Sequence, residues 1–270
     1  MAFIASAPNG MILDEIQKAP QLLEFIQVMV DNNSGNGRFI ITGSHQPELA
    51  QAISESLAGR TGIAELLPLS ANELASAGFN TSKRNDMIFT GSMPRIYNSN
   101  IPPTRFYADY FRTYIERDVR KILNVTDIDR FELFIKLLAG RVGQLINRQA
   151  LAADVGVSDK TIANWISVLR ASYIIFPLKP YYRNFGKRQT KAPKIYFFET
   201  GLVSYLLGIR TSEMVTTHPL VGNLFENLVV SEEIKHRFNK GKESDVYFYR
   251  NSSGSIEIDM IVEDAGKIHP

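Results

Sequence analysis

The chain has 270 residues, more than one domain usually contains, so we expect two or three compact units. Thirty basic against 28 acidic residues leave a formal charge of +2, so a nucleic-acid partner would need local basic clusters. The absence of cysteine excludes disulfides, thiolate catalysis and cysteine-type zinc sites, which fits a cytoplasmic protein. No apolar run approaches the roughly 20 residues of a membrane-spanning helix, so no membrane partner is expected.

Two adjacent carboxylates follow the first predicted strand, the apolar run Gly10 to Leu13. Ligands bind at the carboxyl ends of strands in open α/β sheets, where Asp14 could hold Mg²⁺ and Glu15 could activate a water molecule. The alternative is a solvated turn before the predicted helix at residues 20–31, which has Pro20 at its first position.

The next segments continue an alternating pattern. We predict a strand at residues 38–44, a helix at 47–59 and a third strand at 63–70. Ser70 and Glu73 have the spacing of a capping box for a short helix. The order strand, helix, strand, helix, strand predicts a parallel α/β sheet. Residues 78–104 are polar, with Gly and Pro and little periodicity, and predict a linker or an irregular connection.

A helical region follows, with amphipathic patterns at residues 105–123 and 129–143. Asn147 and Ser158 can then cap two short helices joined by a turn at Gly156, and the second helix has apolar residues at helical spacing: Ile162, Trp165, Ile166 and Leu169. Two apolar strands flank the segment at 179–193. The pattern predicts a winged helix-turn-helix.

Basic residues are concentrated near the predicted wing. Six of them and no acidic residue occur from Lys179 to Lys194, which predicts phosphate contact. The candidate nucleic-acid-binding residues fall into two groups. Lys160 and Asn164 lie on the outer face of the second helix, and Lys187, Arg188 and Lys191 lie in the predicted wing. The alternative is that this unit packs against a protein partner.

The last segment combines a helix that contains Glu226 with two strands joined by the turn NSSGS. Glu257 and Asp259 alternate onto one face of the second strand. Carboxylates from a helix and a strand could share a metal ion. The alternative is a polar face without a metal, which is the commoner case in two-stranded ribbons.

Seven motifs occur in one order: GMILDEIQKAP, GRFIITGS, SLAGRTGIAELLPLS, YIERDV, KAPKIYFFETGL, GNLFENLVVSE and EIDMIVE. In this order, from about Gly10 onward, the chain resembles a bacterial and archaeal family of AAA-type ATPases with a C-terminal domain of unknown function.

The resemblance implies ATP and Mg²⁺ as cofactors. It implies that ILDE is the Walker B strand, with Asp14 in the Mg²⁺ shell and Glu15 as the residue that activates water. It further implies that Thr42 or Ser44 acts as sensor 1 and that Arg60 has a phosphate or interdomain role. Glu226 and Asp259 match the first two acids of a restriction-endonuclease-like fold proposed for the family's C-terminal domain.

Two departures limit these expectations. No G-x-x-x-x-G-K-[ST] sequence occurs in the 270 residues, so the backbone cradle for phosphates and its Lys are missing. The sequence also stops at KIHP, where the family continues into a strand of the form Glu-x-Lys. We therefore expect a fragment cut at both ends, or the product of a shortened gene, with exposed apolar edges and without ATPase activity by itself.

The predicted fold class is α/β plus α+β, in four parts. These are a partial AAA-type parallel sheet at 1–78, a linker and helical region at 79–140, a winged-helix-like unit at 141–200 and a partial endonuclease-like α/β domain at 201–270. The leading hypothesis is part of an ATP-hydrolysing protein whose winged helix contacts DNA or a protein partner. The alternatives are a non-enzymatic DNA-binding module and the remnant of a metal-dependent nuclease, and the chain could form homo-oligomers.

Overall fold

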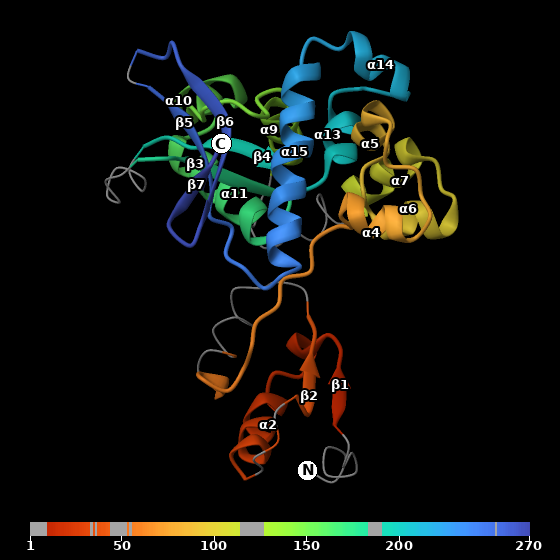
Figure 1. The fold of residues 1–270 in the computed structure, drawn as a ribbon, viewed down its shortest axis with the longest axis vertical. Coiled ribbons are helices and arrows are strands. Elements are labelled where there is room, and N and C mark those ends of the chain that lie inside the picture. The colour runs from red at the N-terminus through yellow and green to blue at the C-terminus, as the bar shows by residue number, and fades with distance from the viewer. Residues whose placement is uncertain are drawn as a thin grey trace. The chain divides into compact units, whose positions relative to one another are not determined.

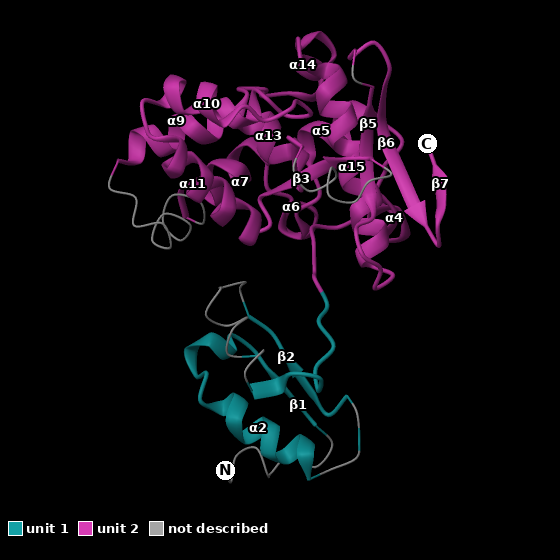
Figure 2. Ribbon diagram, turned by 90° about the vertical axis from the view of Figure 1, so that its left-hand side faces the viewer, with its two compact units in different colours: residues 1–64 teal, residues 65–270 magenta. Residues whose placement is uncertain are grey.

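The computed structural model describes residues 10–32, 35, 37–43, 53, 56–113, 127–182, 191–251 and 253–270. The chain divides into two compact units, residues 1–64 and residues 65–270, which Figure 2 distinguishes by colour. The expected division into four parts is a different partition of the chain, and it stays a prediction.

The first unit is built on two parallel strands. Strands β1 (Met11–Leu13) and β2 (Phe39–Ile41) pair in register, and between them the chain forms a 3-10 helix, η1 (Ile16–Lys18), and helix α2 (Leu22–Asp31). The predicted strand, helix and parallel strand are therefore confirmed. Side chains of β1, η1 and α2, together with Leu57, form a small core, whose buried members are Leu13, Ile16, Leu23, Ile26 and Leu57.

The other face of this sheet is apolar and exposed. Ile12 and Ile40 are register partners, and they are 67% and 56% exposed. They lie opposite the core because alternate strand residues point to opposite faces.

The second unit contains most of the helices. In chain order they are α4 (Ala71–Ser76), α5 (Arg84–Thr90), α6 (Pro94–Ser99), α7 (Pro103–Tyr110), α9 (Ile128–Ala139), α10 (Arg148–Val155), α11 (Asp159–Ala171), α13 (Thr200–Leu206), α14 (Ser212–Thr217) and α15 (Val221–Phe238). The predicted capping box at α4 is confirmed, since the Ser70 side chain and the Glu73 side chain each bond the other residue's amide. The predicted caps Asn147 and Ser158 are confirmed at α10 and α11, and Gly156 takes the left-handed conformation between them at φ 75°.

Two predictions in this part of the chain are wrong. Residues 63–70 form no strand, and Ile63 and Leu66 are 83% and 93% exposed, so the apolar run there does not enter a sheet. The predicted linker at 78–104 contains the helices α5 and α6, which bury Met87, Ile88 and Ile96. These helices have seven and six residues, too few for a 3.6-residue period to show in the sequence.

One five-stranded sheet runs through the second unit (Figure 1), in the order β4 (Lys194–Phe197), β3 (Ile175–Pro180), β5 (Val246–Arg250), β6 (Glu257–Asp264) and β7 (Lys267–His269). β3 is antiparallel to β4 and parallel to β5, and β5, β6 and β7 form antiparallel pairs. Strands of the expected winged-helix unit and of the expected C-terminal domain therefore share one sheet. An isolated bridge also pairs Leu145 with Lys194.

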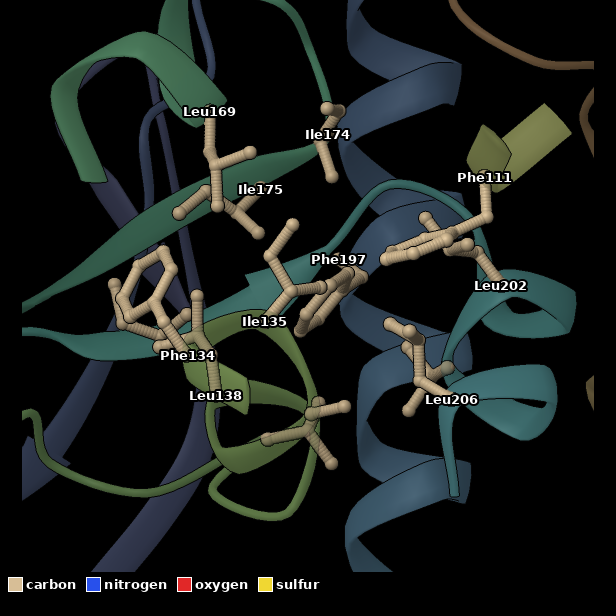
Figure 3. Close-up of a cluster of buried hydrophobic side chains, with 14 of the residues drawn as sticks. Phe111, Phe134, Ile135, Leu138, Leu169, Ile174, Ile175, Phe197, Leu202 and Leu206 are labelled. Carbon is tan, nitrogen blue, oxygen red and sulfur yellow. The ribbon is translucent and has the colours of Figure 1, made fainter. Parts of the chain in front are cut away.

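The larger core lies where helices α9, α11 and α13 meet β3 and β4. Figure 3 shows Ile135 of α9 beside Phe197 of β4, with Leu202 of α13 nearby, and all three are almost wholly buried. Trp165 of α11 packs edge-on against Phe131, with ring centroids 5.2 Å apart. The inward face predicted for the second helix of the helix-turn-helix is thus confirmed for Ile162, Trp165 and Leu169.

A buried polar network joins α13 and α15 to the loop after α5. Oε1 of Glu199 accepts hydrogen bonds from the amides of Ser92, at 2.9 Å, and Gly201, at 3.1 Å. The ammonium of Lys235 donates to the Ser92 hydroxyl at 2.8 Å and to Glu232 at 2.9 Å. Burial, opposed by these partners, raises the pKa of the Glu199 carboxyl above its usual value.

Candidate nucleotide site and carboxylate cluster

The two parallel strands bring Asp14 and Thr42 together. Each residue directly follows its strand, and the Thr42 hydroxyl donates a hydrogen bond to Oδ1 of Asp14. The Thr42 amide donates to the carbonyl of Leu13 at 2.8 Å, which extends the pairing beyond the strands. Both side chains are exposed. A carboxylate and a hydroxyl at the carboxyl edge of parallel strands are oxygen ligands of the kind that Mg²⁺ prefers.

Glu15 lies beside this pair in an uncommon conformation. Its backbone is left-handed, at φ 54° and ψ 46°, and its side chain is partly buried. The amide nitrogen of Gln17 donates a hydrogen bond to Oε2 of Glu15. Sequence analysis did not single out Gln17, because a Gln two residues after an acid has no recognisable spacing signal by itself.

Ser44 and Arg60 were also expected near a phosphate. Ser44 lies outside the described residues. The guanidinium of Arg60 bonds both carboxylate oxygens of Asp31 and the carbonyl of Ala58 at 3.2 Å. Arg60 therefore ties the end of α2 to the segment that leaves the first unit, and its phosphate role stays a prediction.

A second cluster surrounds Lys194 at the start of β4. Its ammonium contacts a carboxylate of Glu226 at 2.8 Å, of Glu257 at 2.7 Å and of Asp259 at 3.0 Å. The Lys194 side chain is 5% exposed, and the carboxylates reach it from α15 and from one face of β6. The prediction that Glu257 and Asp259 share a face is therefore confirmed.

The cluster fixes the charge of its central residue. Burial alone would lower the pKa of Lys194, but the hydrogen bonds that its ammonium donates to Glu226, Glu257 and Asp259 raise the pKa above its usual value. Burial and the neighbouring Glu226 carboxylate likewise raise the pKa of Tyr196, whose hydroxyl donates to Glu226. Both shifts favour the protonated forms, the ammonium of Lys194 and the neutral hydroxyl of Tyr196.

This arrangement corrects one expectation and limits another. Lys194 belongs to the basic run in which phosphate contact was expected, but its ammonium is buried against three carboxylates. Within the described part of the chain, no three or more His, Asp or Glu side chains are grouped so as to hold a metal ion. An ammonium already lies between Glu226 and Asp259, and their role as metal ligands stays a prediction.

The expected nucleic-acid contacts are only partly described. Lys160 and Asn164 are exposed on the outer face of α11, and Lys191 is exposed before β4. Lys187 and Arg188 lie outside the described residues. Near the start of α11, Asp159 and Arg148 form an ion pair at 3.5 Å, so the charges there partly cancel.

Three family models match successive parts of the chain. An AAA domain matches residues 2–75, a domain of unknown function (DUF8612) matches residues 81–213, and another domain of unknown function (DUF4143) matches residues 221–270. The first and third matches support an AAA-like, ATPase-related protein.

Two curated proteins are similar to the chain over almost all of its length. They are the uncharacterized proteins Mb2031c of Mycobacterium bovis and Rv2008c of Mycobacterium tuberculosis, each 30% identical over 265 residues. The alignments cover 97% of this chain but 58% of each relative, so the chain spans little more than half of their length. No solved structure matches the chain significantly.

None of the helices in the described ranges combines the length and apolar character that crossing a membrane requires.

Proposed function

We propose that the first unit supplies the carboxylate half of an ATP-hydrolysing site. In this proposal Asp14 holds Mg²⁺, directly or through water, Thr42 orients Asp14 and senses the terminal phosphate, and Glu15 accepts a proton from the attacking water. The hydrogen bond between Thr42 and Asp14 at the carboxyl ends of β1 and β2 is the observation that supports it most directly. The match of residues 2–75 to an AAA domain agrees with it.

The test uses the longest protein that the gene encodes, with Mg-ATP as substrate. Glu15→Gln should lower hydrolysis by about 10²–10⁴-fold, the usual contribution of a general base, while binding of a fluorescent ATP analogue is retained. Asp14→Asn should weaken the dependence of binding on Mg²⁺. Hydrolysis by Glu15→Gln at the wild-type rate would refute the assignment.

A second candidate function is nucleic-acid binding by residues 141–200. Its support is the order of elements: helix α9, the bridge at Leu145, helices α10 and α11, and the antiparallel strands β3 and β4. A winged helix-turn-helix has this order, and α11 would then present Lys160 and Asn164 to a groove.

Salt dependence tests this second function. Binding to a DNA duplex should weaken as salt rises, with a log–log slope that falls by roughly two units when Lys187 and Arg188 are both changed to Ala. Lys160→Ala should reduce the slope by about one unit if that side chain contacts a phosphate. Binding that does not respond to salt, or no binding, would refute the proposal.

A further inference from the structure

The backbone hydrogen bonds that join the two parallel strands skip Glu15. In a regular parallel ladder, the Thr42 amide would donate to the carbonyl of Leu13 and the Glu15 amide would donate to the carbonyl of Thr42. The first bond is present at 2.8 Å, but the second comes from the amide of Ile16, at 3.1 Å. Glu15 is therefore an extra residue beside β2, as in a β-bulge, and a bulge re-aims the side chain of the residue it contains.

This left-handed conformation of Glu15 is costly, and the residues that follow it hold it in place. A left-handed backbone costs a residue with a side chain roughly 1–2 kcal/mol. Ile16, the next residue, is 2% exposed in the core of the first unit, so its burial anchors the turn. The amide of Lys18 also donates to the carbonyl of Glu15 at 2.9 Å. Strained residues that the surrounding structure retains are concentrated at functional sites.

Gln17 fixes the side chain that the bulge re-aims. The 3-10 turn of η1 brings residue 17 beside residue 15, and the Gln17 amide nitrogen donates to Oε2 of Glu15. We propose that Gln17 is a positioning residue for Glu15, an inference that rests on the ATP-hydrolysing function proposed above.

The chemistry explains why such a residue is needed. A general base must remain within hydrogen-bond reach of the proton that it removes, and a displacement of about 1 Å can cost on the order of 10²-fold in rate. A Glu side chain rotates about three bonds, so the bulge alone does not fix its carboxylate. The neutral Gln17 amide restricts this rotation through its hydrogen bond to Oε2.

The experiment is a double-mutant cycle in the longest protein that the gene encodes, with Mg-ATP as substrate. Gln17→Leu retains the approximate size of the side chain and removes the donor. It should lower kcat by about 10–100-fold with KM changed by less than about twofold. In the Glu15→Gln background the same change should have no further effect on the residual rate, because Gln17 acts through Glu15. Gln21→Leu is the matched control, since Gln21 is exposed and makes no capping bond.

The outcomes separate this inference from the function on which it rests. If Glu15→Gln abolishes hydrolysis but Gln17→Leu behaves like Gln21→Leu, only the positioning role is refuted. An effect of Gln17→Leu that is equal in both backgrounds also refutes it, because a purely structural contribution would be additive. If the wild-type protein does not hydrolyse ATP, or if Glu15→Gln leaves hydrolysis unchanged, the proposed function fails and the positioning role fails with it.

Discussion

Asn227 offers the sharpest test of how the second unit is held together. β4 is at the edge of its sheet, where Phe197 would have a backbone amide and carbonyl without a strand partner. The side chain of Asn227, from α15, replaces that partner: its Oδ1 accepts from the Phe197 amide at 2.7 Å, and its Nδ2 donates to the Phe197 carbonyl at 3.0 Å. Asn227 and Phe197 are both 0% exposed, so water cannot replace either bond.

Asn227→Ala leaves two buried backbone groups unsatisfied. Each costs about 1–3 kcal/mol, so the variant should lose about 2–6 kcal/mol in free energy of unfolding. Asn227→Asp keeps the acceptor, lacks the donor and places a charge beside a buried carbonyl, so it should also be destabilised although its shape is unchanged.

Urea denaturation measures both variants through the fluorescence of Trp165. It is the one Trp of the sequence and is 5% exposed in the core of the second unit, so its signal reports that unit. The matched control is Asn164→Ala on the exposed face of α11, which should change stability by less than about 0.5 kcal/mol. A loss below about 1 kcal/mol in Asn227→Ala would refute the idea that this side chain replaces a strand.

Three further predictions concern charge and packing. Lys194→Met should lose about 1–3 kcal/mol in free energy of unfolding, because it removes the cation that the Glu226 carboxylate, 16% exposed, contacts at 2.8 Å; a change near zero would contradict this. The raised pKa of Glu199 means that its contribution to stability is fully present below its unfolded pKa of about 4.3 and is lost as the pH rises through its folded pKa. The stability advantage of the wild type over Glu199→Gln should therefore shrink as the pH rises above about 4.3 in denaturation experiments, and a difference that stays constant with pH would argue against it. Gly91→Ala should destabilise by at least about 1–3 kcal/mol in the same assay, since its Cβ would overlap the side chains of Glu199 and Tyr107; a change near zero would mean that these side chains move aside.

Local signals in the sequence were sufficient for much of the fold. The caps Ser70, Asn147 and Ser158 and the turn at Gly156 were predictable because each depends on residues within one helical turn. Asp14 and Thr42 could be expected to meet because two consecutive parallel strands place their carboxyl ends at one edge.

Other features depend on partners far away in the sequence. Lys194 looked like one more basic residue of a solvated run, and its three carboxylates follow it by 32, 63 and 65 positions, a separation that no local pattern reports. The apolar run at 63–70 has strand composition, but a strand also needs a neighbour to pair with. The bulge at Glu15 was equally unpredictable, since its sequence differs in no way from a regular strand end.

The pairing of β3 with β5 also has a consequence for synthesis of the chain. β3 and β4 can pair once both have left the ribosome, but the other edge of β3 has no partner until Val246–Arg250 follows. At roughly 5–20 residues per second, that interval lasts on the order of several seconds on the ribosome. During it β3 presents an open apolar edge to other nascent chains. A mutation that slowed elongation between α13 and β5 would lengthen this exposure and lower the yield of soluble protein without changing the folded state.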